Sequence, residues 1–397
     1  MPDRVTSQLD PFSPEFRADP YAAYEELRGL GKVVYLEKHD IWCVHHYDTC
    51  QQVLTDYETF SNAGGGGIKN YFKEKPWRKP SIILEVDPPE HTRTRTVLSR
   101  ALSPRVLRQI RDRFEVDAAR MVAEAGAKGE IEGVSELTRP YPLKVFPDSV
   151  GLADADRDNL LIYGTMVFGA FGPTVPWYEE YMETHKDVPE WIIARCQRDA
   201  LAEGGIGQMI YAAADEGKIT EEEAMMLVRT FLSAGVDTTV DSIGLCLRAL
   251  AEHPDQYAKL REDPSLARNA FEEATRYDSS SQSIFRTTLT ECEVAGQKIG
   301  ANEKVMCFLG SASRDGAHFE DPDAFDITRK IKGQIGYGVG IHGCVGQMFA
   351  RLEAECFFQA FAQQIESVEV TGPTELRMHP GLRGLTKLPL KLTPKAA

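Results

Sequence analysis

The sequence predicts a mainly α protein, a single helical domain with small β-sheets. Helical periodicity dominates the chain, and the segment from Thr220 to His253 has apolar residues on nearly every face, as a helix in the centre of a large protein does. Strand-like alternation is confined to short segments. The 397 residues would allow two or three domains, but no linker rich in Pro, Gly and Ser separates them. We therefore expect one domain over residues 1–397, with residues 1–15 as an extended tail.

Local signals place the elements in order. Prolines and an acid in a first turn begin one helix at residue 87, and a Thr220–Glu223 capping box begins another, which ends before Pro254. The expected helices cover residues 20–29, 87–113, 220–253, 265–277 and 345–365, and the expected strands lie within 34–44, 284–294, 304–309 and 368–392. The run Gly64–Gly67 precedes no Gly-Lys-Ser/Thr, which predicts a mobile loop rather than a phosphate cradle.

Composition excludes several classes of protein. Lys and Arg number 45 against 60 Asp and Glu, and the net charge of −15 argues against binding a nucleic acid or an anionic membrane. The eight cysteines form no Cys-x-x-Cys, so zinc and iron–sulfur sites lack local support. Scattered thiols fit a reducing compartment. Glycines and prolines interrupt the longest uncharged stretch, residues 159–178, which argues against a membrane-spanning helix there. These features predict a cytoplasmic protein.

The segment from Gly336 to Gly346 carries the clearest chemical signal. Alternate glycines allow the backbone to turn tightly and to approach a flat group, and Cys344 follows at the expected start of a helix. A helix N-terminus favours the thiolate form of cysteine, and nearby amides can donate hydrogen bonds to a sulfur that binds a metal. Cys344 is therefore a candidate metal ligand.

With its spacing Gly-x-Gly-x-His-x-Cys-x-Gly, this segment resembles the haem-binding loop of the cytochrome P450 family, and the resemblance covers nearly the whole chain. It implies haem b, with Cys344 as the iron ligand and Tyr337 and Gly338 beside the cofactor. It also implies that Glu273 and Arg276 anchor this loop. By the same resemblance, the haem propionates are bound by His91, Arg95, Arg286 and His342.

A second motif, residues 234–239, lies in the middle of the long predicted helix. A buried Asp237 is costly without a partner, and residues i and i+1 do not share a helix face. For Asp237 and Thr238 to serve one site, the helix must open locally, which Gly235 permits. The resemblance implies that this pair relays protons to bound dioxygen. The alternative is a threonine bonded back to its own helix beside an ion-paired aspartate.

The chain is most similar to soil-bacterial family members that demethylate small para-methoxy aromatic acids and release formaldehyde. The resemblance implies that the substrate carboxylate is held by Arg78, Ser81, Arg229 and Thr230, and that the ring is enclosed by Phe168, Phe171 and Ile284. Ala234 is a further residue expected to bind the substrate. The chain departs from this subgroup at Lys79 and Thr230. Alternatives are a neutral methoxyphenol such as guaiacol or an alkylguaiacol, a terpene or fatty acid, and a haem sensor without turnover.

Basic residues gather locally in this acidic chain. One acid, Asp112, lies among seven arginines between residues 93 and 113: Arg93, Arg95, Arg100, Arg105, Arg108, Arg111 and Arg113. They are either an ordinary basic helix face or a docking surface for an acidic ferredoxin. On the second interpretation, electrons from NAD(P)H pass through a ferredoxin reductase and the ferredoxin to the haem. The residues from Ser61 to Lys75 are expected to cover the pocket.

Overall fold

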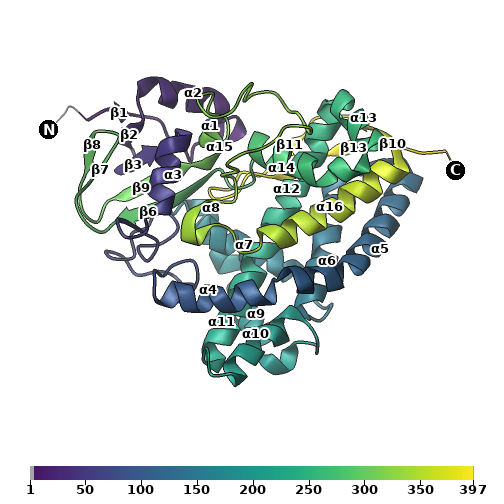
Figure 1. Ribbon diagram of the computed structural model, residues 1–397, viewed down its shortest axis with the longest axis horizontal. Coiled ribbons are helices and arrows are strands. Elements are labelled where there is room, and N and C mark those ends of the chain that lie inside the picture. Colours follow the sequence, from purple (N-terminus) through teal and green to yellow (C-terminus); the bar gives the residue numbers. More distant parts are fainter. Residues whose placement is uncertain (1–3, 397) are drawn as a thin grey trace.

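A strand-rich part and a larger helical part lie at opposite ends of the molecule (Figure 1). The computed structural model describes residues 4–396. The mainly α fold with small sheets that the sequence predicts is confirmed.

The helices are α1 (Pro14–Ala18), α2 (Tyr21–Leu30), α3 (Tyr47–Thr55), α4 (Glu90–Ala101), α5 (Pro104–Lys128), α6 (Pro140–Val150), α7 (Asp158–Gly169), α8 (Pro176–Thr184), α9 (Val188–Arg195), α10 (Ile206–Asp215), α11 (Glu221–Gly235), α12 (Asp237–Glu252), α13 (Pro254–Glu262), α14 (Ala267–Tyr277), α15 (Leu309–Ala312) and α16 (Gln347–Gln364).

The strands are β1 (Thr6–Ser7), β2 (Val33–Leu36), β3 (Ile41–Val44), β4 (Phe60–Ser61), β5 (Glu130–Glu132), β6 (Ser283–Thr288), β7 (Cys292–Val294), β8 (Gln297–Ile299), β9 (Lys304–Phe308), β10 (Ile365–Val370), β11 (Glu375–Leu376), β12 (Leu385–Lys387) and β13 (Pro389–Pro394).

The largest sheet has the strand order β1-β2-β3-β9-β6-β4. Strands β2 and β3 form the antiparallel pair expected within residues 34–44, and β9 lies parallel to β3. Strand β6 pairs antiparallel with β9, with Arg286 opposite Val305, and Arg286 is buried. Because apolar residues of β3 and β9 form the core beneath this sheet, the sheet is a rigid support for the Arg286 side chain.

Helices α5, α14 and α16 pack together in the helical part of the fold (Figure 1). The ring of Phe349 on α16 meets Phe114 on α5 and Phe146 on α6 at centroid distances of 5.4 and 5.3 Å, edge to face. Such contacts add to the stabilisation that burial provides. They hold the start of α16, and hence the segment that leads into it, against the core.

The long helix expected over residues 220–253 is wrong as a single helix, because it is divided into α11 and α12 at Val236. The predicted Thr220–Glu223 capping box is present. The local opening that Gly235 was expected to permit is confirmed. A Cβ atom at Gly235 would lie 2.2 Å from Cζ of Phe146, so only glycine allows the two chains to approach here.

The helix expected over residues 87–113 is also two helices, α4 and α5, with a break at residues 102–103. Pro104 has no amide hydrogen to donate within a continuous helix, but it suits the first position of a new one. Pro104 therefore begins α5, which extends to Lys128, beyond the predicted boundary.

The glycine run at residues 64–67 is buried, which contradicts the expectation of a loosely held loop. A Cβ atom at Gly67 would lie 2.5 Å from Cα of Phe171, and the ammonium group of Lys304 donates to the Gly65 carbonyl oxygen at 2.8 Å. The glycines are needed for close packing against neighbouring backbone rather than for mobility.

The extended tail expected over residues 1–15 is only partly correct. Thr6 and Ser7 are extended and pair parallel with β2, but residues 14–15 already belong to α1, and residues 1–3 lie outside the described part. Within residues 4–396, no helix combines the length and the apolar composition needed to cross a membrane.

Candidate active site

The loop that carries Cys344 is folded tightly by its own backbone. The amide of Cys344 donates to the Tyr337 carbonyl oxygen at 2.8 Å, and Gly338 and Gly340 have φ values of +67° and +74°. A Cβ atom at Gly340 would lie 2.5 Å from the Leu54 carbonyl oxygen. Positive φ together with this close approach explains why glycines alternate here.

Cys344 precedes α16 by three residues, whereas the sequence suggested that it opens the helix. Helix α16 begins at Gln347 with Gly346 as its N-cap. The Cys344 side chain is exposed, yet the protein packed around its sulfur raises the pKa of the thiol, while the Gly346 amide and the cations Arg95 and Arg351 lower it. A bound metal ion would favour the thiolate further.

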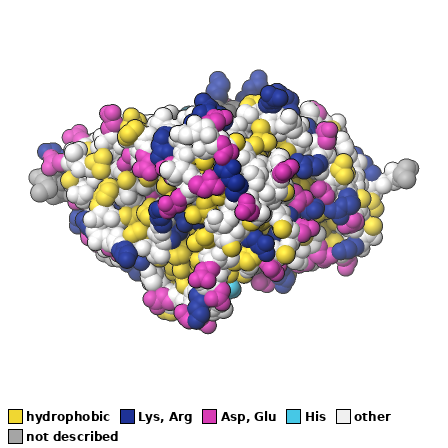
Figure 2. All heavy atoms as spheres, turned by 90° about the horizontal axis from the view of Figure 1, so that it is seen from below, with side chains coloured by type: hydrophobic (Ala, Val, Ile, Leu, Met, Phe, Trp, Pro, Cys, Tyr) yellow, Lys and Arg dark blue, Asp and Glu magenta, His cyan; other side chains and the backbone are white. Residues whose placement is uncertain are grey.

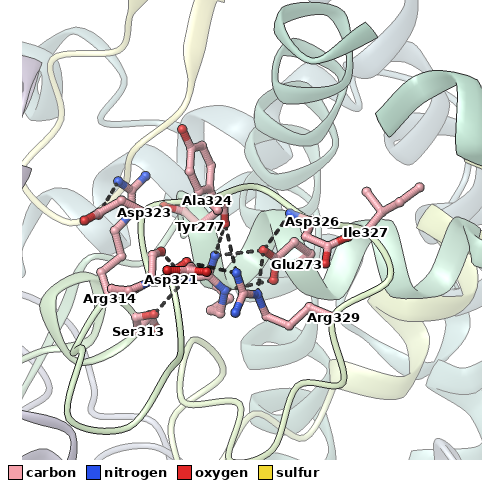
Figure 3. A network of polar contacts seen from close by, with 12 residues as sticks. Glu273, Tyr277, Ser313, Arg314, Asp321, Asp323, Ala324, Asp326, Ile327 and Arg329 are labelled. Atoms are coloured by element: carbon pink, nitrogen blue, oxygen red, sulfur yellow. Dashed lines mark hydrogen bonds and ion pairs between the residues drawn. The ribbon is translucent and has the colours of Figure 1, made fainter. Parts of the chain in front are cut away.

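The predicted Glu273–Arg276 pair is confirmed as a buried anchor and not a surface ion pair. Both side chains are fully buried, and Arg276 donates to both carboxylate oxygens of Glu273 at 2.8 Å. Figure 3 shows the network around Glu273, which also accepts from Arg329 and from the Asp326 amide, each at 3.0 Å. The remaining donors of Arg276 bond to the carbonyl oxygens of Ser313, Pro322 and Ala324.

Helix α14 transmits this anchor to the cysteine loop. A Cβ atom at Gly336 would lie 2.9 Å from Cγ2 of Thr275, and Gln334 donates to the Glu272 carbonyl oxygen at 2.9 Å. Glu272 also pairs with Arg351, whose guanidinium lies 4.5 Å from the centroid of the Tyr337 ring. The loop is thus held by the helix that carries the buried anchor.

Four basic side chains predicted to bind propionates converge beside this loop. The rings of His91 and His342 lie 4.3 Å apart, and all four of their ring nitrogens are buried without a hydrogen-bond partner among the described residues. Arg95 donates to the Gly343 carbonyl oxygen at 2.6 Å, and Arg286 donates to the carbonyl oxygen of its neighbour Phe285. Buried polar atoms without partners are rare, so these ring nitrogens are suited to hydrogen bonding with a bound group such as a carboxylate.

Electrostatics show what kind of ligand this cluster suits. Burial lowers the pKa of all four groups, that of His91 to about 4. The neighbouring cations lower the pKa of each histidine further. The Asp87 carboxylate lies 3.7 Å from Nε2 of His342 and offsets part of the positive charge. An additional anion, such as a pair of carboxylates, would stabilise the cluster.

The residues present therefore fit haem b. Cys344 would ligate the iron, the four basic groups would hold the propionates, and Tyr337 and Gly338 belong to the loop beside it. Haem bound through a thiolate supplies the chemistry of dioxygen activation. Within residues 4–396, no cluster of His, Cys, Asp and Glu could hold a metal ion by itself. The Tyr337 hydroxyl is buried without a hydrogen-bond partner among those residues.

At the junction of α11 and α12, Thr238 is accessible whereas Asp237 is buried. Ala234 and Thr238 are accessible, and the Thr238 hydroxyl donates to the Ala234 carbonyl oxygen at 2.8 Å. Asp237 is buried, with its two oxygens 3.0 and 3.1 Å from the guanidinium of Arg377. The structure thus contains the back-bonded threonine and the ion-paired aspartate that the sequence left as an alternative. Relaying a proton would require Asp237 to leave Arg377.

The sequence analysis missed Arg377 and Asp241. Arg377 follows β11, where its amide donates to the Gly384 carbonyl oxygen at 2.9 Å, and no local motif marks it. Asp241, 3.3 Å from the same guanidinium, was detectable because it lies four residues after Asp237 on one helix face. Burial raises the pKa of both carboxyls, that of Asp241 to about 8.

The structure brings together the four residues predicted to hold a substrate carboxylate. The hydroxyls of Ser81 and Thr230 lie 3.1 Å apart. Arg78 and Arg229 both donate to the Lys79 carbonyl oxygen, at 3.0 and 3.1 Å. Residues about 150 positions apart in the sequence therefore form one polar cluster.

Glu85 is a partner of this cluster that the sequence analysis missed. Its two oxygens accept from Arg78 at 3.0 and 3.2 Å and from the Ser81 amide at 2.7 Å. Arg229 is 7% exposed and makes no ion pair with any residue from 4 to 396. The two arginines and Glu85 carry a net charge of +1.

The predicted apolar wall is partly assembled. The rings of Phe168 and Phe171 lie 5.4 Å apart at 58°, and Phe171 packs against the glycine run. Ile284 belongs to the other side of the site, because a Cβ atom at Gly338 of the cysteine loop would lie 3.7 Å from its Cδ1 atom.

The seven arginines between residues 93 and 113 divide into two groups. Arg93 pairs with Glu223, Arg111 pairs with Glu355, and Arg95 faces the cysteine loop. The other four are exposed and make no ion pair with the part of the chain described here: Arg100, Arg105, Arg108 and Arg113. Acidic and basic side chains are interspersed on the face shown in Figure 2, so any basic docking surface is local.

Comparisons with known proteins agree with this geometry. The family model "Cytochrome P450" matches residues 179–393. "Cytochrome p450 CYP199A2" of Rhodopseudomonas palustris is 48% identical over 97% of this chain and 94% of its own length. The structure titled "cytochrome P450 CREJ in complex with (4-ethylphenyl) dihydrogen phosphate" superposes with a TM-score of 0.87 at 27% identity, over 97% of this chain and 99% of that one. CYP109Q5 from Chondromyces apiculatus gives a TM-score of 0.82 at 31% identity, over 98% and 99%.

Proposed function

Because the chain belongs to the cytochrome P450 family of haem-thiolate monooxygenases, we propose that it O-demethylates a small para-substituted aromatic acid such as 4-methoxybenzoate. The products are the corresponding phenol and formaldehyde. Dioxygen and two electrons from NAD(P)H are the co-substrates of the hydroxylation. Hydroxylation of the methoxy carbon leaves an unstable hemiacetal, which breaks down to these two products.

The observation that carries this proposal is the charge balance of the polar cluster. Glu85 neutralises one of the two arginines, and Arg229 is buried without a carboxylate partner among the described residues. A buried charge is costly unless paired, so the cluster is suited to one monoanion. The hydroxyls of Ser81 and Thr230 could donate to the same carboxylate.

The chain's own residues would orient this substrate. With the substrate carboxylate near Arg229 and its ring against Phe168 and Phe171, the para substituent would be directed toward the cysteine loop, where Ile284 lies. Holding the reacting carbon in one geometry is a large part of the rate advantage of an enzyme. One related structure contains (4-ethylphenyl) dihydrogen phosphate, which is also an aromatic anion with a para substituent.

A second candidate substrate is a neutral methoxyphenol. The observation in its favour is that Arg78, one of the two arginines among the four residues predicted to hold a carboxylate, already pairs with Glu85. A guaiacol would then rely on Ser81 and Thr230 for its hydroxyl group.

The test is a titration of the ferric protein with 4-methoxybenzoate and with a 4-alkylguaiacol, monitored by the haem absorption. We expect the acid to produce a saturable shift from low to high spin, and Arg229→Ala to weaken its binding by about a hundredfold. Arg268→Ala, on the exposed face of α14, is the control and should bind as the wild type does. A shift only with the guaiacol would favour the neutral substrate, and release of formaldehyde coupled to NADH use separates an enzyme from a haem sensor.

We also propose that an acidic ferredoxin docks on the exposed arginines of α4 and α5. Arg100, Arg105, Arg108 and Arg113 are exposed, and their charges are not neutralised by ion pairs within residues 4–396. Complementary charge would accelerate encounter, and salt would screen it. Arg108→Glu should reduce the dependence of the electron-transfer rate on salt, and equal dependence in the two proteins would refute docking here.

A further inference from the structure

Two buried carboxylates share one arginine beside the junction of α11 and α12. Arg377 Nη1 lies 3.0 Å from Oδ1 of Asp237 and 3.3 Å from Oδ2 of Asp241, and both acids are 3% exposed. Cβ atoms at Gly384 and Gly164 would collide with Asp241 and Asp237 respectively, at 1.9 and 2.8 Å from their oxygens. The backbone is thus shaped around both carboxylates.

The charges of this triad do not balance. With both acids ionised the triad has a net charge of −1, which is costly in a buried site. Other charged or titratable groups that act on it include Arg139, which pairs with Asp158, and Arg17, Tyr181 and His379, which lie near Arg377. Burial lowers the pKa of His379, which leaves it neutral. One proton shared by the two acids therefore gives the triad its most favourable charge.

We propose that Asp241 is a positioning residue for Asp237, because it keeps Arg377 neutralised when Asp237 turns toward Thr238 carrying the shared proton. The inference rests on the proposed monooxygenase function. In the turned state Asp237 is a neutral acid, and Asp241 and Arg377 form a neutral ion pair. One O–H bond at Asp241 breaks and one at Asp237 forms, and no electron is transferred.

Asp241 makes this movement feasible. If Asp237 were the sole partner, its departure would leave a largely buried guanidinium without a counter-charge, and breaking such a pair is strongly unfavourable. Asp241 lies one turn further along the same face of α12 and already contacts the guanidinium. After Asp237 gives up its proton at the accessible face of Thr238, it returns ionised, and a proton from solvent restores the resting triad. Burial raises the pKa of Asp241 to about 8, which agrees with a proton held near neutral pH.

The experiment compares holoenzyme of the wild type, Asp241→Asn and Asp255→Asn. Asparagine preserves the shape and an acceptor for Arg377 but cannot ionise, and the exposed Asp255 is a matched control on the next helix. For Asp241→Asn we expect an about tenfold lower kcat in NADH-driven turnover and a larger solvent isotope effect, with unchanged KM. Infrared difference spectra should show a protonated carboxylic acid in the wild type near neutral pH that Asp241→Asn lacks.

Each outcome decides the matter. Burial raises the pKa of Glu353, so this carboxyl contributes an acid band to both proteins. Unchanged kcat and isotope effect in Asp241→Asn, or an acid band as strong as in the wild type, would overturn the proposal. If the wild type consumes no NADH with any ligand that shifts its spin state, the proposed function fails, and the infrared comparison still tests the shared proton. If Asp241→Asn does not retain haem, Asp237→Asn serves instead. Asp241 is then the one acid within residues 4–396 that pairs with Arg377, so the acid band of the shared proton should be lost there too, and an undiminished band would overturn the shared proton.

Discussion

Two buried ion networks in this protein differ in which charge is in excess, cations around Glu273 and acids around Arg377. Around Glu273, one carboxylate accepts from two arginines and a backbone amide, and the other donors of Arg276 end on carbonyl oxygens. Around Arg377, two carboxylates compete for one guanidinium. The first network supports the cysteine loop, and the second lies at the opened helix junction.

This difference distinguishes a network with a structural role from one that can take part in proton transfer. A network with every partner satisfied has one favoured arrangement and rigidifies its surroundings. A network with more acids than cations has alternative arrangements of similar energy, and so can move a proton or change partners. The predictions below test this distinction, from the largest expected effect to the smallest.

The largest effect is expected from Glu273→Ala. It would leave Arg276 and Arg329 without their carboxylate in a buried site, at a cost of about 4 kcal/mol in the free energy of unfolding. We expect urea denaturation to show this loss and the purified protein to contain less haem. The control is Arg268→Ala on the same helix, and a Glu273→Ala protein as stable as this control would refute a supporting role.

A smaller loss is expected from Arg377→Met, because its two acids can respond by binding protons. The free energy of unfolding should fall by about 3 kcal/mol at pH 8 and by less at pH 6, where protonation removes the unpaired negative charge. Urea denaturation at the two pH values measures the difference. An equal loss at both values would show that the acids do not take up protons.

The pH dependence of stability should report the proton on Asp241. Its pKa of about 8 exceeds the usual value of 3.8, so between these values the folded state holds a proton that the unfolded state has released. Stability from this group therefore falls as pH rises toward 8, by at most about 1.4 kcal/mol per pH unit. Comparison of wild type with Asp241→Asn between pH 5 and 9 should show a shallower decline in the variant, and parallel curves would contradict the assignment.

The smallest effect is expected from Lys79→Ala. Lys79 and Glu222 form a pair on the surface, with more than half of each side chain exposed. Exposed pairs contribute little, so the free energy of unfolding should change by less than about 0.5 kcal/mol, and haem content should not change. A loss comparable to that of Arg377→Met would mean that exposure is a poor guide to which pairs matter in this protein.

Much of the haem-binding region could be predicted from the sequence. Cys344, Glu273 and Arg276 belong to short motifs, in which spacing along the chain determines which side chains share a turn or a helix face. His91 and Arg95 follow the same logic on α4. The opening at Gly235 was predictable because neighbouring residues cannot both serve one site on a regular helix.

The partners of the site residues were not predictable in this way. Glu85 forms an ion pair with Arg78, and Asp237 forms one with Arg377, which lies 140 positions later in the sequence. The buried glycine run at residues 64–67 is similar, since its contacts with Phe171 and Lys304 come from distant segments. Such pairings leave no periodic trace in the sequence.

The sequence by itself determined the fold class, the cysteine loop and the four polar residues that form the cluster of Arg78, Ser81, Arg229 and Thr230. Only the tertiary structure decided which of those residues already have partners and which remain available, as with Arg78 and Arg229. The physical reason is that burial and the surrounding counter-charges determine whether a charged side chain is already paired or is free to bind a ligand. Those depend on how the chain folds, even for a partner as close in sequence as Glu85 is to Arg78, and not on local spacing alone.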